Sequence, residues 1–540
     1  MLQTGLMMDR ALLISDVIEH AAGQFGDTEI VSRAADGSVF RYNYMQCRAR
    51  ALQLANALAE CGLKAGTSIG SIALNNHRHM EAYYAVSGSG MIIHTCNPRL
   101  HTAQLVYIVN HADDRAVMFD PAFAPLVESV AAQCPGVRHW ICLTDAENMP
   151  DLGVRGEVLC YEEFIGRQSS RFSWPQFDER TAAALCYTSG TTGNPKGALY
   201  SNRSIVLNAL SACLPGLISL SPKDAVLPVV PMFHVNGWCV PYAAPIGGAK
   251  LVLPGARMDA PSIYDLLETE RVTVTAGVPT IWIALMRHIE DGKLPLTSLK
   301  RILVGGSAMP EPLIAKFDQK FGIEVRQAWG MTETVAIATM TCLSSRQAEM
   351  PAAARHSVMA KQGKSVFGVE VKVVDDNGCT LPRDAKSQGQ VMVRGQWTVS
   401  GYYKAQQSAL IDGWLPTGDI ATIDAQGTLQ IRDRAKDLIK TGGEWISSID
   451  LEAVAMAHPA VAMAAVVGVR HPRWEERPLL FIVRKPEQSL ECEEILAFLA
   501  ARVAKWWIPD AVIFLDALPV GGTGKVQKTS LREKYANHLC

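Results

Sequence analysis

Residues 187–197 (YTSGTTGNPKG) have the composition of a loop that binds phosphate groups. The run contains three glycines, one serine, three threonines and Lys196. Glycines let backbone N–H groups turn toward an anion, hydroxyls add donors, and the lysine adds a positive charge. We therefore predict that this loop binds a polyphosphate. The alternative is an ordinary serine- and glycine-rich surface turn.

The spacing differs from that of the Walker A loop, which ends in Gly-Lys followed by serine or threonine. Here Asn194 and Pro195 separate Gly193 from Lys196, and Gly197 follows the lysine. Proline also removes one N–H group that could bind a phosphate. The loop must therefore bind phosphates in a different way.

The elements that must position this loop alternate between strands and helices. The apolar run 182–186 indicates a buried strand that leads into the loop, and 48–61 has the spacing of an amphipathic helix. Further strands are predicted at 68–74, 116–120, 225–230, 272–277, 301–304 and 325–329, and further helices at 79–86, 123–134 and 279–288. This alternation predicts parallel β–α–β units, in which ligands bind beside the carboxyl ends of the strands.

The predicted secondary structure changes at about residue 366. Residues 369–374 and 389–395, and then 421–431, read as antiparallel hairpins. After the charged segment 432–437, a smaller alternation follows, with strands at 464–468, 479–483 and 511–515 and a helix at 493–506. The predicted fold class is α/β: a large N-terminal domain, 1–433, of α/β subdomains and a β-rich subdomain, then a small α+β domain, 434–540.

Composition excludes several classes of function. Apolar residues make up 48% of the 540 residues, charged residues 19%, and the net charge is −2, which suits a soluble protein and argues against nucleic acid or a membrane surface as partner. The thirteen cysteines occur singly, without a C-x-x-C pair, as in a reducing cytoplasm. No signal-peptide pattern or spanning apolar run appears, so we expect a cytoplasmic protein without integral membrane association. His77 and His79 lack other ligands nearby and are assigned to surface or packing roles.

Several further segments occur in an order that resembles one family. They are PMFHVNGW (231–238), GGSAMP (305–310), WGMTE (329–333), TGD (417–419), 434–445 and PVGGTGK (519–525). With 187–197, they resemble the adenylate-forming (ANL) superfamily of acyl-CoA synthetases, firefly-luciferase-like enzymes and nonribosomal adenylation domains, over nearly the whole chain. PMFHVNGW, TGGEWIS and HPRWEERP most resemble medium-chain acyl-CoA ligases, including methylmercaptopropionate–CoA ligases.

This resemblance implies a two-step reaction. A small-molecule carboxylic acid attacks the α-phosphate of ATP to give acyl-adenylate and pyrophosphate, and the CoA thiol then replaces AMP. The implied catalytic residues are Lys525, His234 and Glu333, with Mg²⁺ held by Thr188 and Glu333 because hard cations prefer oxygen ligands. Lys525 would offset charge between two approaching anions. Lys528, in contrast, reads as a solvated lysine.

The remaining roles also follow from the resemblance. The implied ATP- and AMP-binding residues are Thr188, Ser189, Gly190, Thr191, Thr192, Gly193, Lys196, Gly306, Ser307, Ala308, Gln327, Ala328, Trp329, Gly330, Thr332, Asp419 and Arg434. A small mobile domain would rotate about a hinge near Lys436 and bring Gly442, Gly443, Glu444 and Trp445 to CoA. Each residue also has an ordinary structural alternative: His234 as a packing histidine, Trp329 as core, Asp419 as a turn residue.

The acid itself is left open. A short- or medium-chain fatty acid or methylmercaptopropionate is predicted, but Gly237 replaces an expected alanine and Met309 an expected cysteine beside the acyl pocket. Two other functions stay open: an adenylation enzyme that loads a carrier protein, and an inactive nucleotide-binding protein. Joint presence of His234, Glu333, Asp419 and Lys525 argues against the last. By analogy, a homodimer is possible.

Overall fold

The computed structural model describes residues 5–34, 36–188, 194–441, 444–521 and 525–539. The chain forms two compact units. The first comprises Met1–Thr275 with two short later segments, Met331–Ala336 and Gln396–Ser408. The second comprises Ala276–Gly330, Ile337–Gly395 and Ala409–Cys540.

A mostly parallel sheet in the first unit carries the strand that leads into the predicted phosphate loop. Its strand order is β7-β6-β5-β3-β4-β8-β9, and only β9 runs antiparallel to its neighbour. The bounds are β3 Ser68–Ile72, β4 Ile92–Thr95, β5 Ala116–Phe119, β6 His139–Cys142, β7 Glu157–Cys160, β8 Ala182–Tyr187 and β9 Gly197–Ser201. Val117, Phe119 and Trp140 are fully buried and form part of the apolar core against this sheet.

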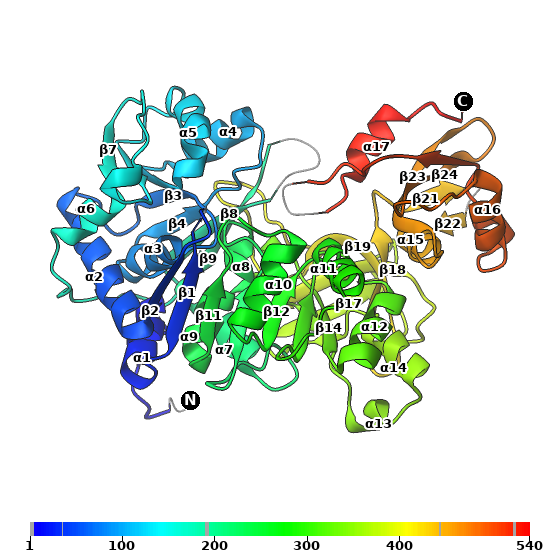
Figure 1. Ribbon diagram of the computed structural model, residues 1–540, viewed down its shortest axis with the longest axis horizontal. Coiled ribbons are helices and arrows are strands. Elements are labelled where there is room, and N and C mark those ends of the chain that lie inside the picture. The colour runs from blue at the N-terminus through cyan, green and yellow to red at the C-terminus, as the bar shows by residue number, and fades with distance from the viewer. Residues whose placement is uncertain (1–4, 35, 189–193, 442–443, 522–524, 540) are drawn as a thin grey trace. The chain divides into compact units, whose positions relative to one another are not determined.

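A second group of strands in the first unit has the order β10-β11-β1-β2. The bounds are β1 Glu29–Arg33, β2 Val39–Asn43, β10 Ala225–Pro228 and β11 Lys250–Leu253. In Figure 1, β1 (blue) lies beside β11 (green), and the two pair in parallel although more than 200 residues separate them. The N-terminal strands therefore complete a sheet whose other members come from mid-chain.

The helices of the first unit are mostly short and capped. They are α1 Ile14–Gln24, α2 Tyr44–Glu60, α3 His77–Gly88, α4 Thr102–Ala112, η1 Pro121–Phe123, α5 Ala124–Ala131, η2 Ala146–Asn148, α6 Tyr161–Gly166, α7 Asn202–Cys213, α8 Val235–Trp238, α9 Val240–Gly247, α10 Ala260–Thr269 and η3 Thr332–Thr334. Asn76 caps α3 through its side chain, which accepts from the His79 N–H. His79 is fully buried and its ring contacts Ser71 and the Leu74 carbonyl. His77 is buried too, so both histidines have packing roles.

The second unit begins within β12 Val274–Gly277 and combines α/β, antiparallel and C-terminal parts. Its helices are α11 Pro279–Gly292, α12 Glu311–Phe321, α13 Ser345–Ala348, α14 Ala352–Met359, α15 Ser448–Met456, α16 Cys492–Ala500, η4 Lys505–Trp507 and α17 Lys528–Lys534. Its strands are β13 Arg301–Val304, β14 Glu324–Trp329, β15 Thr339–Met340, β16 Lys364–Ser365, β17 Val369–Val374, β18 Gly389–Gly395, β19 Leu415–Ile423, β20 Leu429–Arg434, β21 Ile439–Thr441, β22 Glu444–Ile446, β23 Val461–His471, β24 Glu475–Arg484 and β25 Ala511–Phe514. The order β17-β18-β19-β20 is antiparallel throughout, as predicted for the region after residue 366.

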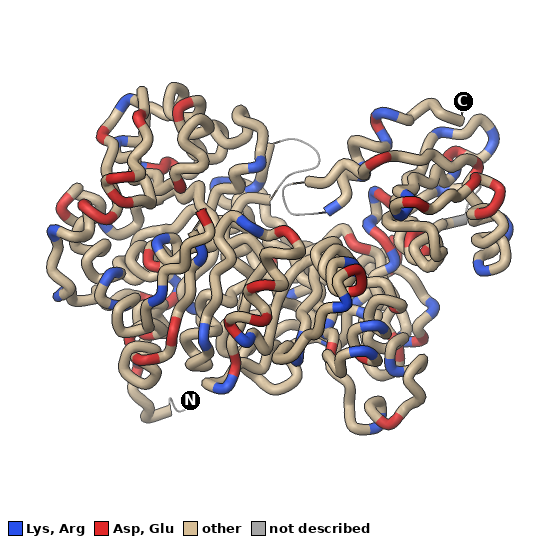
Figure 2. Tube along the Cα trace, viewed as in Figure 1, with Lys and Arg blue, Asp and Glu red and all other residues tan. Residues whose placement is uncertain are grey.

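The predicted α/β alternation is confirmed, and two predicted helices are too long. The helix expected over 123–134 ends at Ala131. The helix expected over 493–506 ends at Ala500. The N–H groups of Arg502 and Val503 both donate to the Leu499 carbonyl, which closes the last turn. Among the described residues, no helix is long and apolar enough to cross a bilayer. Basic and acidic residues are interspersed along the trace in each unit (Figure 2).

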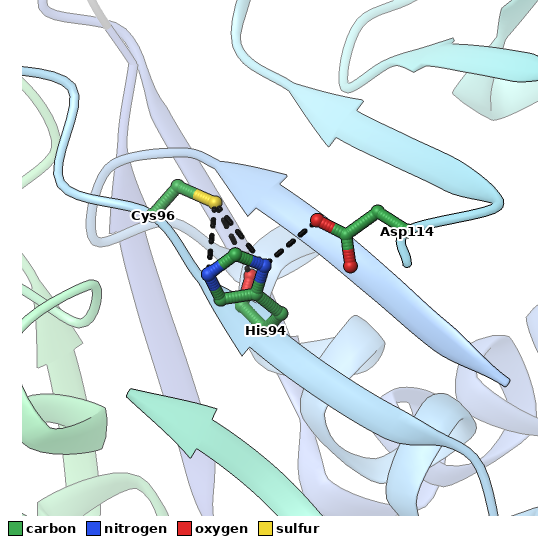
Figure 3. A group of neighbouring side chains, drawn as sticks. All are labelled: His94, Cys96 and Asp114. Atoms are coloured by element: carbon green, nitrogen blue, oxygen red, sulfur yellow. Dashed lines mark hydrogen bonds and ion pairs between the residues drawn. The ribbon is translucent and has the colours of Figure 1, made fainter. Parts of the chain in front are cut away.

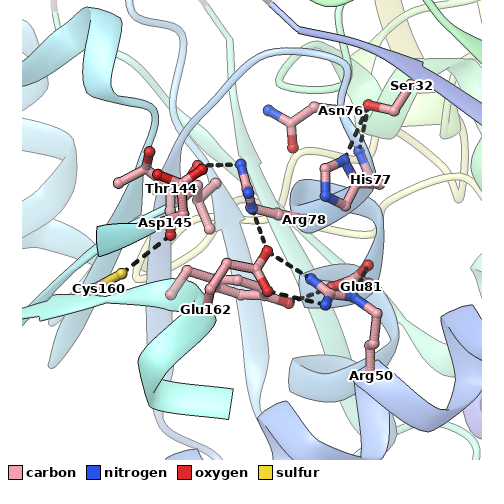
Figure 4. A network of polar contacts seen from close by, with 12 residues as sticks. Ser32, Arg50, Asn76, His77, Arg78, Glu81, Thr144, Asp145, Cys160 and Glu162 are labelled. Carbon is pink, nitrogen blue, oxygen red and sulfur yellow. Dashed lines mark hydrogen bonds and ion pairs between the residues drawn. The ribbon is translucent and has the colours of Figure 1, made fainter. Parts of the chain in front are cut away.

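A partly buried charge network joins three helices of the first unit (Figure 4). Arg50 on α2 donates to Glu81 on α3 at 2.8 Å and forms two hydrogen bonds with Glu162 on α6, at 2.9 and 3.0 Å. The Tyr161 hydroxyl donates to the other Glu81 oxygen at 2.6 Å. The Glu81 side chain is fully buried, so its charge depends on these donors.

Replacing Arg50 by methionine should destabilise the first unit by about 3–5 kcal/mol, because Glu81 would remain as a buried carboxylate without its counter-charge. The measurement is the thermal or urea unfolding of the purified variant. Arg10→Met is the matched control, since Arg10 forms a largely exposed pair with Asp16 and its loss should cost less than about 1 kcal/mol. Equal effects of the two changes would contradict the role given to the network.

Candidate functional site

Strands β8 and β9 bring the two ends of the predicted phosphate loop together. Tyr187 pairs with Gly197, and the Thr188 N–H donates to the Lys196 carbonyl at 2.9 Å. Thr188 and Lys196 are therefore held together at the end of a buried strand. Lys196 is exposed. The predicted phosphate contacts Ser189, Gly190, Thr191, Thr192 and Gly193 lie outside the described residues.

Glu333 lies on η3, in one of the two short later segments that belong to the first unit. Its side chain is buried, and its Oε1 accepts a hydrogen bond from the Tyr402 hydroxyl at 2.7 Å. The neighbouring Thr332 carbonyl accepts from the Tyr200 hydroxyl on β9 at 2.6 Å. The structure thus brings Glu333 and Thr332 to the strand that follows the predicted phosphate loop.

Tyr402 is a residue that the sequence analysis missed. The ammonium group of Lys196 lies 5.0 Å from the centre of the Tyr402 ring, a cation–π distance. One side chain therefore contacts both Lys196 and Glu333. The available signal was a pair of adjacent tyrosines, Tyr402 and Tyr403, directly after Ser400 and Gly401.

His234 precedes a turn with an unusual backbone. Val235, Asn236, Gly237, Trp238 and Cys239 all have positive φ angles, from 47° to 61°. The left-handed conformation costs most residues about 1–2 kcal/mol each. Such strain is concentrated at functional sites, and here it lies directly after the predicted catalytic histidine.

Two features explain how this turn is held. Gly237 takes φ +61°, a conformation that glycine adopts without the cost a Cβ would bring, so its departure from the expected alanine has a backbone reason. Asn236 is fully buried, and its Oδ1 accepts a hydrogen bond from the Cys186 thiol at 3.0 Å. Because Cys186 lies on β8, this contact fixes the turn to the strand that enters the predicted phosphate loop.

A separate cluster forms within the second unit. The Trp329 indole N–H donates to Asp419 at 2.8 Å, and the other Asp419 oxygen lies 2.9 Å from Arg434 Nε. Asp419 and Arg434 face each other across the β19–β20 pair. Three residues predicted to bind the nucleotide are thus brought together by one buried carboxylate.

Lys525 lies next to this cluster. A Cβ added to Gly306 would lie 2.7 Å from Lys525 Cε, so the glycine leaves room for the lysine side chain. Burial, and next the neighbouring Arg434, lower the pKa of Lys525 to about 8, while Asp419 opposes the shift. Near pH 7 the group is therefore still mostly an ammonium ion, although it can lose its proton more easily than an ordinary lysine.

The other predicted nucleotide residues differ in how they are used. The Gln327 side chain is buried, accepts from the Met309 N–H at 2.8 Å and donates to the Ala360 carbonyl at 2.5 Å. Its amide group therefore forms hydrogen bonds with the protein backbone, and a contact of Gln327 with adenine stays a prediction. Ser307 is exposed, and Ala308, Ala328 and Gly330 are partly exposed.

The predicted hinge and CoA contacts can be placed only in part. Lys436 is exposed, in the turn between β20 and β21. Trp445 on β22 is 47% exposed and stacks with the Lys440 ammonium group at 5.0 Å. Gly442 and Gly443 lie outside the described residues, as does the side chain of Glu444.

The expectation that Lys528 is solvated is wrong. Its ammonium group lies 2.7 Å from Glu452 and 2.5 Å from the Ser448 hydroxyl, with 15% of its side chain exposed. Burial alone would lower the pKa of Lys528, but the Glu452 carboxylate outweighs burial and raises it. The lysine is paired because α17 and α15 both pack against β23, which brings Lys528 to Glu452. These neighbours could not be predicted from the local sequence.

His94, Cys96 and Asp114 are buried together in the first unit (Figure 3). His94 Nδ1 lies 2.7 Å from Asp114 Oδ2, and Ser68 donates to the other Asp114 oxygen at 2.7 Å. Cys96 Sγ is almost equally far from both ring nitrogens, 3.7 and 3.6 Å, so it lies along the lone pair of neither. The geometry fits a buried ion pair better than a shared metal ion.

Two family descriptions match the chain. The AMP-binding enzyme family matches residues 18–403, and the AMP-binding enzyme C-terminal domain matches residues 450–525. This chain belongs to the AMP-binding enzyme family. The predicted family, fold class and enzyme class, an AMP-forming acid–CoA ligase, are confirmed.

Relatives within the AMP-binding enzyme family match almost end to end. The 3-methylmercaptopropionyl-CoA ligase of Ruegeria lacuscaerulensis is 46% identical, covering 99% of this chain and 99% of the relative. The medium-chain-fatty-acid–CoA ligase of Ectopseudomonas oleovorans is 44% identical, covering 99% and 98%. Among solved structures, the anthranilate CoA ligase AuaEII in complex with anthranoyl-AMP superposes with a TM-score of 0.87 at 25% identity, covering 98% of each chain.

The buried His94–Asp114 pair predicts a pH dependence of stability. Burial would lower the pKa of His94, but Asp114 outweighs burial and raises it to about 10, above the ordinary 6.5. A raised folded-state pKa gives stability that is complete below about pH 6.5 and is lost as the pH rises toward 10.

Asp114→Asn should therefore lower the melting temperature at pH 6 and flatten its decline between pH 6.5 and 10. Thermal unfolding across this pH range is the measurement. Asp113→Asn is the adjacent control, because Asp113 is exposed and pairs with Lys404 at the surface. A decline as steep in Asp114→Asn as in the unaltered protein would contradict the assignment.

Proposed function

We propose that this chain converts a medium-chain fatty acid or 3-methylmercaptopropionate into its CoA thioester in two steps. In the first, a carboxylate oxygen attacks the α-phosphorus of ATP, the α–β bond breaks, and pyrophosphate leaves. In the second, the CoA sulfur attacks the acyl carbon, the bond to AMP breaks, and the thiol proton passes to the surroundings. The activities named for the two relatives described above, which are 46% and 44% identical to this chain, support this choice of acid.

The observation that carries the proposal is the cluster around Asp419. An indole, a carboxylate, a guanidinium and the Lys525 ammonium lie together in the second unit. In our proposal Asp419 binds the ribose hydroxyls, Arg434 contacts ribose and phosphate, and Trp329 with Gly306, Ser307, Ala308 and Gly330 encloses adenine. Lys525 then offsets negative charge where the carboxylate meets the α-phosphate.

The first unit supplies the proposed pyrophosphate end. Residues 188–193 and Lys196 bind the β- and γ-phosphates, and His234 orients the reacting carboxylate. For Mg²⁺, Thr188 and Glu333 offer a hydroxyl and a carboxylate, and Glu333 Oε2 has no hydrogen-bond partner among the described residues. This oxygen set fits Mg²⁺. When bound, the ion would neutralise phosphate charge.

The second step requires a change of partners. We propose that residues 434–540 rotate about Lys436, withdraw Lys525, and bring Gly442, Gly443, Glu444 and Trp445 to the pantetheine arm of CoA. A short exposed turn at Lys436 suits a hinge. The domain boundary at 433/434, a homodimeric state and a cytoplasmic location stay predictions of the same kind.

The proposed function predicts acid-dependent release of pyrophosphate and, with CoA, formation of AMP and an acyl-CoA. Purified protein should be assayed with ATP and Mg²⁺ against short-, medium- and long-chain fatty acids, 3-methylmercaptopropionate and aryl acids, with thioesters identified by mass spectrometry. Medium-chain acids or 3-methylmercaptopropionate should give the highest kcat/KM. Acid-dependent release with transfer to a carrier protein, but not to CoA, would favour the alternative acceptor. No release with any acid would contradict catalysis.

Lys525→Ala should slow acyl-adenylate formation by about 100-fold or more, because the charge that meets the two anions is lost. Thioester formation from supplied acyl-AMP should stay within about threefold of the unaltered enzyme, since Lys525 serves only the first step. Lys534→Ala, which removes an exposed lysine of α17, is the control. If both half-reactions fell equally, the division of labour would be wrong.

A further inference from the structure

The two short segments that join the first unit late in the sequence meet each other there. The Val399 N–H donates to the Glu333 carbonyl at 2.9 Å, and the Tyr402 hydroxyl donates to the Glu333 side chain at 2.7 Å. The sequence that separates the two segments, 337–395, belongs to the second unit. Glu333 is therefore held, in both main chain and side chain, by a segment more than 60 residues away.

Three consecutive residues of this segment contact Lys196, the start of β9 and the end of α4. Tyr402 lies under the Lys196 ammonium group, and the Tyr403 N–H donates to the Gly197 carbonyl at 2.8 Å. The Lys404 ammonium group donates to the His111 carbonyl at 2.7 Å and pairs with Asp113 at 2.6 Å. These contacts leave the Tyr402 ring little freedom to turn.

We propose that Tyr402 is a positioning residue for the metal and pyrophosphate end of the site: its hydroxyl fixes Glu333 and its ring supports Lys196. The hydrogen bond occupies Glu333 Oε1 and leaves Oε2 for the cation. Outer partners that orient a metal-binding carboxylate raise metal affinity by about 10- to 100-fold in other proteins. This inference rests on the proposed function, in which Glu333 holds Mg²⁺ and Lys196 contacts phosphate.

The chemistry of the hydroxyl suits this role. A tyrosine hydroxyl carries its proton at neutral pH, so Tyr402 can donate to the Glu333 carboxylate. A donor restricts the rotation of the carboxylate without adding a competing negative charge. The ring acts independently, because a cation over an aromatic face is attracted whether or not the hydroxyl is present.

The two contacts can be separated by substitution. Tyr402→Phe removes the hydroxyl and keeps the ring under Lys196, whereas Tyr402→Leu removes both. Tyr403→Phe is the matched control: it makes the same chemical change one residue away, where the ring packs against His111 and neither Glu333 nor Lys196 is contacted. Calorimetric titration of ATP, with saturating Mg²⁺ and again with EDTA, measures binding without turnover.

Tyr402→Phe should weaken ATP binding about tenfold with Mg²⁺ and less than about twofold in EDTA, because the hydroxyl acts through the metal-binding carboxylate. Tyr402→Leu should add a loss of about threefold that persists in EDTA, from the cation–π contact. Tyr403→Phe should change neither titration by more than about twofold. If Tyr402→Phe weakened binding equally in both conditions, or no more than Tyr403→Phe, the inference would be overturned.

Glu333→Gln distinguishes a failure of the inference from a failure of the proposed function. If Glu333→Gln left the Mg²⁺-dependent part of ATP binding unchanged, the assignment of Glu333 to the metal would fail, and the inference with it. If Glu333→Gln weakened binding and Tyr402→Phe did not, only the inference would fall. Adding Tyr402→Phe to Glu333→Gln should cause no further loss, since a removed carboxylate cannot be positioned. Should Tyr402→Leu not fold, Tyr402→Phe and this double variant still decide the matter.

Discussion

Asp419 is the charge on which the arrangement of the second unit depends. Two cationic groups, Arg434 and Lys525, lie close together there, and Lys525 is partly buried. Two like charges in such surroundings repel strongly unless a carboxylate lies between or beside them. Asp419 supplies that carboxylate, and the Trp329 indole satisfies its second oxygen. The unit can therefore hold these two positive charges close together.

In the first unit, the strained feature is the backbone of the turn after His234, not a group of charges. The left-handed turn after His234 is unfavourable for its non-glycine residues, and especially for the β-branched Val235. It persists because Asn236 is anchored to β8 through Cys186, in a fully buried position. Local sequence preference and the adopted structure disagree here, and such disagreement is typical of sites where geometry serves function.

Sequence patterns predicted the strands because an apolar run depends on neighbours in the chain, and the site segments were predicted from their resemblance to the adenylate-forming superfamily. Apolar runs located β8, β13 and β14, and the polar residues after them marked the strand ends where the site lies. Contacts between distant residues were not predictable in this way. Tyr402 and Glu333 are 69 residues apart. His94 lies on β4 and Asp114 just before β5, and Lys528 pairs with Glu452 across 76 residues. The hydrogen bonds of the Gln327 amide with the backbone of Met309 and Ala360 likewise depend on tertiary packing alone.

The membership of residues 331–336 and 396–408 in the first unit also bears on how the protein is made. A nascent chain that has emerged only as far as Thr275 lacks Glu333 and Tyr402, and its Tyr200 hydroxyl has not yet met the Thr332 carbonyl. At about 5–20 residues per second, synthesis of the 133 residues that follow Thr275 up to Ser408 (408 − 275) takes roughly 7–27 s. During that interval the N-terminal half exists without the segments that complete it. The site is therefore assembled late, and a truncated chain lacks the contacts that hold Glu333.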